Sequence, residues 1–233
     1  MKLLAVLILY ILNYISLSAY DDMHVKRLLS FKECIECDLT KADLSKLDLS
    51  GSNISGSDLS FANLSGTNLE NADLSYATLI KSKIYIANLN NSNLEGANLT
   101  QARLNGSSLV KANLIDATMI YSVLSKSKAS EIILDGANLK YTKFRGADLK
   151  KAKISGSVLA FTDFSSANLT GAEMKALDLS NSVFISAKLD QVDFSGSNVS
   201  GMNFAKFDLE PSNFINSIVC DTLFPWKGNE KKC

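Results

Sequence analysis

A large apolar residue recurs at every fifth position of this chain from Leu39 to Phe224, without an insertion or a deletion. We call this residue the centre of each pentapeptide, and Ala129 is the only small centre. A mostly small residue, here called the shelf, lies two positions before each centre, as Ala42 lies before Leu44. Most of the chain is therefore one repeat, and its period decides the fold.

A period of five residues fits neither the helical period of 3.6 nor the strand period of 2. In an extended chain, the shelf and the centre point to one face because alternate residues share a face. Three residues separate each centre from the next shelf, so a corner in every pentapeptide must absorb the odd residue. The pattern predicts a chain that winds around an axis with shelf and centre inward. The other three positions, rich in Ser, Lys, Asn, Asp and Gly, point outward.

The phenylalanines indicate how many pentapeptides close one turn. One series of centre phenylalanines is spaced by twenty residues, and a second series is offset from it by ten. Stacked rings at this spacing imply four pentapeptides in each coil, with the two columns on opposite walls. Residues 37–226 contain 38 pentapeptides, which predicts nine to ten coils. At ~4.8 Å between stacked strands, the rod is about 45 Å long. The main core ladder is Phe144, Phe164, Phe184, Phe204 and Phe224, and the second is Phe194 and Phe214.

The repeat resembles the pentapeptide repeat family, whose motif is Ala, then Asp or Asn, then Leu and two variable residues. The resemblance covers most of the chain and is specific for the fold. It implies an all-β protein, a right-handed quadrilateral β-helix, and implies little about function. Segments that match the motif as written are Ala62-Asn63-Leu64, Ala97-Asn98-Leu99, Ala137-Asn138-Leu139, Ala147-Asp148-Leu149 and Ala167-Asn168-Leu169.

The first nineteen residues do not fit the repeat. Lys2 precedes an apolar run from Leu3 to Leu12, and small residues follow up to Ala19. This order is typical of a secretory signal peptide, so we expect residues 1–19 to be removed. The mature protein would then be periplasmic, lumenal or secreted, without stable membrane insertion. The alternative is a membrane anchor through residues 3–19, near the lower length limit for a span.

Residues 20–36 are expected to form a short capping helix and a loop. Asp21 and Asp22 can cap this helix. An apolar helix face would cover the first coil, whose open end otherwise invites end-to-end assembly. Exported members of the family that the chain resembles begin similarly, with a short helix followed by Cys-x-x-Cys. The residues expected on the apolar face are Val25, Leu28 and Leu29.

The four cysteines lie at the two ends of the repeat, Cys34 and Cys37 before it and Cys220 and Cys233 after it. Bridged Cα atoms lie within about 7 Å, whereas the rod ends are about 45 Å apart. Within one chain, this leaves the pairs Cys34–Cys37 and Cys220–Cys233. The second disulfide would close the tail, residues 227–233, over the last coil.

Other states of the first cysteine pair stay open. Free thiols are one alternative to the disulfide. A redox site normally needs the start of a helix to lower the thiol pKa, whereas this motif leads into the repeat. A zinc site needs two further ligands, which are not close in sequence. Trp226 is expected to help the C-terminal disulfide to cover the other end of the rod.

Nothing in the sequence predicts an enzyme. Catalysis needs titratable groups that converge in a pocket, whereas the predicted interior is filled with Leu, Ala, Ser and Phe. The one histidine, His24, is expected on the surface of the capping helix. We therefore expect no catalytic, cofactor-binding or metal-binding residues and no cofactor.

The outer surface holds one candidate interaction site. Residues twenty apart stack in outward columns, and one column places Tyr121, Tyr141 and Phe161 in a contiguous ladder. Exposed aromatic patches often mark interfaces. The alternative is a ladder that stabilises only its own strands. Our hypothesis is a contact with a protein partner, or with another copy of the chain, centred on Tyr141.

Charge is balanced over the whole chain but uneven along it. The totals balance at 24 basic and 24 acidic residues, so no nucleic-acid partner is expected. Residues 36–75 hold seven acids and two lysines, whereas residues 126–153 hold eight basic residues and three acids. A solvated surface is the simpler interpretation, and an oriented contact with another copy is the alternative.

The function that the sequence favours is a non-enzymatic, exported scaffold that presents a rigid surface to a protein or to itself. The resemblance implies one alternative, because some family members mimic DNA and bind DNA gyrase. That function requires a cytosolic protein with a continuous acidic surface. A secreted effector that acts on a host is a further alternative.

Overall fold

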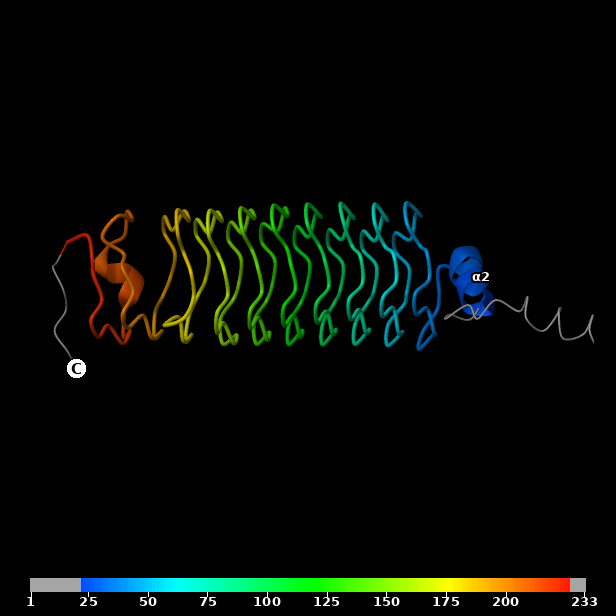
Figure 1. Cartoon of the computed structure of the whole chain (residues 1–233), viewed down its shortest axis with the longest axis horizontal. Helices are drawn as coiled ribbons and strands as arrows, with labels where there is room; N and C mark the ends of the chain where they lie inside the picture. Colours follow the sequence, from blue (N-terminus) through cyan, green and yellow to red (C-terminus); the bar gives the residue numbers. More distant parts are fainter. Residues whose placement is uncertain (1–21, 227–233) are drawn as a thin grey trace, which may run out of the picture.

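In the computed structural model, which describes residues 22–226, the chain winds into one rod of stacked coils (Figure 1). Parallel β-bridges join residues twenty positions apart, as Asn63 joins Lys83 and Lys83 joins Arg103. The bridges are backbone hydrogen bonds between coils, such as the 2.7 Å bond from the Leu64 amide to the Lys83 carbonyl. Four bridging positions recur in each twenty residues, so each coil has the four sides that the phenylalanine spacing predicts.

Each pentapeptide turns its corner at the second residue after the centre. The backbone φ there is positive, 59° at Lys46 and 69° at Gly66. The amide of the next shelf then donates to the carbonyl of the centre, as Ala62 donates to Leu59 at 3.0 Å. Left-handed corners therefore absorb the odd residue of the five-residue period.

The interior of the rod is filled by side chains. Centre residues such as Leu64 and Leu169 are fully buried. Polar shelf residues find acceptors inside: the Ser57 hydroxyl donates to the Cys34 carbonyl at 2.6 Å, and the Thr142 hydroxyl donates to the carbonyl of Met119 at 2.7 Å. Backbone carbonyls of the preceding coil, or of the same coil as for Ser52, accept from most of the buried shelf hydroxyls, whereas the hydroxyls of Ser122 and Ser127 have no partner within the described residues.

The small centre Ala129 does not kink the rod. Its neighbour Lys128 bridges Ser108 on one side and Asp148 on the other. Ile132 occupies a shelf position with its side chain fully buried. A large shelf residue next to the small centre accounts for the regular coil at this point.

The phenylalanine columns stack in the core, with one interruption. Phe184 and Phe204 are linked through Phe194, which meets Phe184 edge-on at 6.5 Å and lies tilted at 5.6 Å from Phe204. Ring contact therefore crosses from one wall to the other in the C-terminal coils. The stacked pairs within columns are Phe144–Phe164, Phe164–Phe184, Phe204–Phe224 and Phe194–Phe214, with ring centroids 5.3, 5.1, 6.2 and 5.3 Å apart.

The ladder of bridges is incomplete near the C-terminus. Within residues 22–226, no bridge joins Val183 to Asn203, or Lys188 to Asp208. A 3-10 helix, η1 (Pro211–Phe214), interrupts the repeat there, and the five-residue period does not predict it. Because the pairing is broken in these coils, the count of nine to ten coils stays a prediction.

The helix α2 (Asp22–Phe31) caps the N-terminal end of the rod (Figure 1). Leu28 is fully buried and Val25 packs against the core. The prediction that Leu29 joins this face is wrong, since its side chain is 48% exposed. One residue further along a helix is rotated by about 100°, so only the pair spaced by three faces the first coil.

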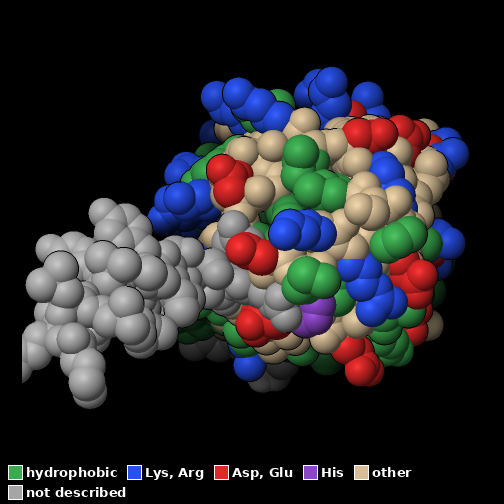
Figure 2. All heavy atoms as spheres, turned by 90° about the vertical axis from the view of Figure 1, so that its right-hand side faces the viewer, with side chains coloured by type: hydrophobic (Ala, Val, Ile, Leu, Met, Phe, Trp, Pro, Cys, Tyr) green, Lys and Arg blue, Asp and Glu red, His purple; other side chains and the backbone are tan. Residues whose placement is uncertain are grey.

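His24 anchors α2 to the first coil instead of standing free on the surface. Its ring is half-buried, and its Nδ1 accepts a 3.1 Å hydrogen bond from the Asp38 amide. Seen end-on, this end of the rod shows hydrophobic side chains surrounded by charged ones of both signs (Figure 2).

At the opposite end, Trp226 stacks on Phe224 with centroids 4.9 Å apart and lies 5.9 Å from Phe214. It thus adds a last ring to the aromatic core, as expected from the sequence. The tail predicted for residues 227–233, and the signal peptide predicted for residues 1–19, lie outside the described residues.

Asp and Asn residues before the centres lock the outer backbone of the first coils. Oδ1 of Asp43 accepts hydrogen bonds from the Ser45 amide at 3.1 Å and from the Asn63 side chain at 3.0 Å. Asp48 is bonded in the same way by Ser50 and Asn68. Hydrogen bonds from Ser45 hold the pKa of Asp43 below its ordinary value of 3.8. The bond from the Ser45 side chain has the larger effect, and the bond from the Ser45 amide has the next largest.

Replacing the buried centre Leu169 by Asp tests the inward assignment. The carboxylate would lie unpaired in a solid core, and we expect a loss of at least about 4 kcal/mol in the free energy of unfolding. Leu169→Met is the control, because a swap of similar volume costs less than about 1.5 kcal/mol. Denaturant unfolding measures both, and an unchanged midpoint for Leu169→Asp would contradict an inward Leu169.

The lowered pKa of Asp43 predicts acid sensitivity of the first coils. A carboxyl group whose folded pKa is depressed stabilises the fold above its unfolded value near 3.8, and the contribution disappears as pH falls through the folded pKa. Asp43→Asn keeps the oxygen acceptor without the charge. We expect this variant to lose less thermal stability than the parent protein between pH 6 and pH 3. Asp208→Asn serves as a charge-matched control, and an equal drop in Asp43→Asn and the parent would contradict the prediction.

Candidate functional site

The aromatic ladder lies on one corner of the rod. Tyr121 and Tyr141 stack with ring centroids 4.7 Å apart, and Tyr141 and Phe161 stack at 5.1 Å. The planes of the two pairs differ by 10° and 7°. The structure therefore brings together the three residues that the twenty-residue spacing in the sequence placed in one column.

The ladder stays open to solvent although its rings cover one another. The exposed fractions are 53% for Tyr121, 39% for Tyr141 and 53% for Phe161. Because neighbouring rings cover each other's faces, the ladder offers ring edges along most of its length. Ring edges carry partial positive charge and favour acidic or π-face partners.

The backbone under the ladder is strained. All three residues occupy the left-handed corner, with φ of 59° at Tyr121, 59° at Tyr141 and 60° at Phe161. This conformation costs about 1–2 kcal/mol per residue compared with its right-handed counterpart. Each stacked pair returns about 0.5–1.5 kcal/mol. Stacking thus offsets much of the strain, and the ladder has a local structural role whatever else it contacts.

Another aromatic residue of the same column stands apart from the ladder. Phe61 is half-exposed and lies under the ammonium group of Lys81, 5.5 Å from its ring centroid. Gln101 separates this pair from Tyr121 in the column. The same corner therefore carries one aromatic–cation pair and, beyond Gln101, the three rings of the ladder.

Coil register sorts the charges onto different sides of the rod, which the blocks of charge along the sequence do not reveal. One side is made by the stacked segments 61–66, 81–86, 101–106, 121–126 and 141–146, which contain no Asp or Glu. We call this side the basic face. Its six cations are all exposed, and they are Lys81, Lys83, Arg103, Lys126, Lys143 and Arg145.

A corner of the rod about twelve residues further along each coil has the opposite charge. It is built from the segments 33–38, 53–58, 73–78, 93–98, 113–118 and 133–138, which contain no Lys or Arg. We call this side the acidic corner. Every one of its six coils carries at least one carboxylate, and these are Glu33, Glu36, Asp38, Asp58, Asp73, Glu95, Asp116 and Asp135.

Few of these charges are neutralised within the chain. On the basic face, Arg145 pairs with Asp163 at 3.3 Å, and on the acidic corner Glu33 pairs with Arg27 at 3.7 Å. These are the only ion pairs that residues 22–226 form from the two charged sides. Most of the charge on both sides therefore faces solvent.

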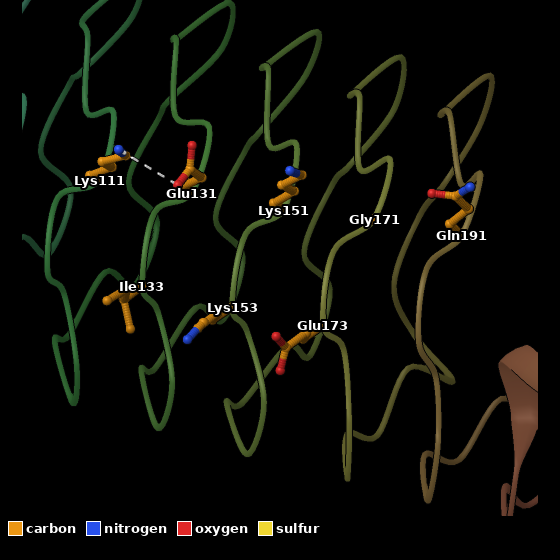
Figure 3. A pocket seen from close by; sticks show the side chains of 8 residues that line it. All are labelled: Lys111, Glu131, Ile133, Lys151, Lys153, Gly171, Glu173 and Gln191. Atoms are coloured by element: carbon orange, nitrogen blue, oxygen red, sulfur yellow. Dashed lines mark ion pairs between the residues drawn. The ribbon is translucent and has the colours of Figure 1, made fainter.

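An open groove of about 730 Å³ follows the wall opposite the basic face, and its Ile133 also belongs to the acidic corner. Figure 3 shows its two columns of side chains, with Lys111 paired to Glu131 at 3.8 Å in one column and Lys153 next to Glu173 along the other. The side chains lie along the surface and mix both signs of charge. The groove supplies no converging acid, base and nucleophile.

A smaller cleft of about 290 Å³ opens where coils separate near Val183 and Asn203. Its wall contains Phe184, Phe204 and Phe207 from the core. The missing β-bridge leaves the edge of a coil unpaired at this point. Five-residue periodicity gave no signal for this cleft.

The first two cysteines form a disulfide between α2 and the first coil. Cys34 and Cys37 are bonded, with their Cα atoms 5.5 Å apart, and both are buried. They follow the C-terminal end of α2, so no helix start lowers a thiol pKa there. Cys220 is described but Cys233 is not, so the second disulfide stays a prediction.

Residues 22–226 hold no group of three His, Cys, Asp or Glu side chains arranged for a metal ion. No helix among them has the length and the apolar character needed to cross a membrane.

Comparisons with solved structures identify related rods. HetL, a pentapeptide repeat protein involved in heterocyst differentiation regulation in the cyanobacterium Nostoc sp. strain PCC 7120, is 24% identical, with 85% of this chain and 91% of HetL covered and a TM-score of 0.44. QnrB1, a plasmid-mediated fluoroquinolone resistance protein, is 22% identical over 65% of this chain and 87% of QnrB1, with a TM-score of 0.42. A pentapeptide repeat protein from the Arabidopsis thaliana thylakoid lumen is 23% identical over 42% of this chain and 68% of that protein, with a TM-score of 0.41.

A search of curated proteins found no significant match. The family model for pentapeptide repeats matches eight copies between residues 32 and 201. The family match agrees with the four bridging positions in each twenty-residue coil. With this match over most of its length, together with the twenty-residue coils and left-handed corners described above, the chain belongs to the pentapeptide repeat family.

Proposed function

We propose that this protein is a non-enzymatic interaction scaffold whose rigid rod presents the ladder of Tyr121, Tyr141 and Phe161 to a protein partner. The observation that carries the proposal is the exposure of three stacked aromatic rings on a strained corner. A corner occupied by Gly would avoid that strain. Aromatic residues there combine a large contact area with little conformational freedom to lose on binding.

The rest of the fold supports a scaffold. The core is filled with Leu, Ala and Phe, so the coils have little freedom to rearrange. The open groove beside Lys111 and Glu131 lacks the converging groups of an active site. Members of the family are generally structural or interaction proteins, and the proposal keeps this chain within that class.

Charge does not favour the gyrase-binding alternative. A mimic of DNA needs negative charge along its binding surface, with the phosphates' close spacing. The basic face of this rod presents six cations and no carboxylate over five coils. The acidic corner alone is too narrow a stripe to reproduce both strands of a duplex.

We further propose that the mature scaffold works outside the cytoplasm. The predicted signal peptide over residues 1–19, the capping segment 20–36, the repeat 37–226 and the tail 227–233 make up the proposed organisation. The Cys34–Cys37 disulfide supports this location, because structural disulfides persist in oxidising compartments. The alternative is a membrane anchor through residues 3–19. The intact-mass measurement below distinguishes the anchored protein from the exported one.

The double substitution Tyr121→Ser, Tyr141→Ser tests the ladder. We expect binding to a partner recovered by crosslinking to weaken at least about tenfold, because aromatic anchors often dominate an interface. Gln191→Ser is the control, since Gln191 occupies the same kind of left-handed corner, with φ of 58°, outside the basic face and the acidic corner. Thermal unfolding measured in parallel separates lost binding from lost stability. Binding by the double variant as tight as by the parent protein would remove the ladder from the interface.

The intact mass of the protein isolated from its source cells tests export. After alkylation without reduction, we expect a chain that lacks the first 18 or 19 residues and carries no label on its four cysteines. A full-length chain without label would support the membrane anchor. A full-length chain with four labelled thiols would contradict both export and the two predicted disulfides.

A further inference from the structure

The two charged sides of the rod lie opposite each other within the same coils. A coil has twenty residues, so residues ten apart lie on opposite walls. Lys83 follows Asp73 by ten residues, and Lys126 follows Asp116 by ten. The charge difference is therefore built across the rod, at right angles to its axis.

The two sides also match in their spacing along the axis. Four consecutive coils carry at least one cation on the basic face, and the acidic corner carries at least one carboxylate at each of these levels. If a second rod lies parallel and unstaggered beside the first, every cationic level faces a carboxylate level. The opposed pairs are Lys83 with Asp73, Arg103 with Glu95, Lys126 with Asp116, and Arg145 with Asp135.

The structure points to a second copy of this chain as the partner of the basic face. We propose that parallel rods associate side by side, the basic face of one copy against the acidic corner of the next. This rests on the proposed scaffold function and names its partner. Two copies share the same rise per coil, so opposite charges face each other at every level along the whole contact. An unrelated partner would have the same spacing of charges only by coincidence.

The ladder gives a reason to prefer a protein surface over a nucleic acid at this face. Single-stranded nucleic acids bind through bases that stack on open aromatic faces. Here Tyr121, Tyr141 and Phe161 cover one another's faces and leave mainly edges open. Edges and tyrosine hydroxyls suit carboxylates, which the acidic corner of a neighbouring copy supplies.

Such a contact does not close on itself. The surfaces that meet are different, so the interface is heterologous, and each added copy leaves one free basic face and one free acidic corner. The whole chain has a formal net charge of zero, so no overall repulsion opposes association. Side-by-side growth into a layer of parallel rods follows, and salt should weaken it because the charges are exposed.

Two variants that each neutralise one side test this assembly. The basic-face variant is Lys126→Gln, Lys143→Gln, Arg145→Gln, and the acidic-corner variant is Glu95→Gln, Asp116→Asn, Asp135→Asn. The control, Lys128→Gln, Lys150→Gln, Lys188→Gln, removes three exposed cations from another side of the rod. Neutral replacements are chosen because reversed charges on both variants could attract each other in a new way.

Sedimentation velocity of the mature protein measures the size of the assemblies at about 0.02 M and about 0.5 M salt. We expect the parent protein and the control to form assemblies beyond dimers at low salt and to dissociate at high salt. Each one-sided variant should stay monomeric alone. An equal mixture of the two should stop at a complex of two rods, because only one intact basic face and one intact acidic corner can meet.

Several outcomes would overturn the proposal. A parent protein that stays monomeric at low salt would do so, as would association that both variants retain, or a mixture that fails to pair. Binding of single-stranded DNA or heparin to the basic face of a monomeric rod would reassign this face to a polyanion. A parent protein that does not self-associate but still binds another protein through the ladder would overturn this inference alone. Normal partner binding by the Tyr121→Ser, Tyr141→Ser variant would overturn only the proposed role of the ladder.

Discussion

Backbone pairing between residues twenty apart is the constraint on which the other features of this rod depend. Neighbouring coils exchange hydrogen bonds in both directions, as Lys83 donates to the Ala62 carbonyl and accepts from the Leu64 amide of the preceding coil. The pairing fixes the register of the chain, so every fifth side chain is forced inward. A one-residue slip would move the leucines outward and bring Asp and Lys into the core.

The same register turns a linear sequence into columns with distinct properties. Side chains that share a column lie one strand spacing apart, close enough for aromatic rings to stack and for Asn and Asp to bond each other. Stacking at Tyr121 and Tyr141, and the side-chain bond from Asn63 to Asp43, are both products of this spacing. Charge obeys the same geometry, which is why cations and carboxylates that alternate along the chain separate onto opposite walls.

The C-terminal coils show what happens when the constraint is relaxed. Large shelf residues such as Phe207 and Met202 are only partly buried, and bridges are missing at Val183 and Lys188. The missing bridges thus occur in the coils that carry bulky side chains at both shelf and centre. The helix η1 and the stack of Trp226 on Phe224 close the end where the repeat itself no longer does.

The five-residue period and the Phe spacing were enough to predict the coil, its four sides and the aromatic ladder, because in a solenoid every contact repeats at a fixed sequence distance. The period could not predict the broken bridges, the helix η1 or the exposed Leu29, since these depend on how bulky groups fit at irregular ends. The Cys34–Cys37 bond needed the spatial closeness of the two residues as well as their spacing. The sequence by itself determined the inward leucines and the stacked columns, because repetition converts sequence distance directly into space. Only the tertiary structure decided where the rod opens, because the missing bridges depend on how bulky side chains fit between neighbouring coils and not on the repeat.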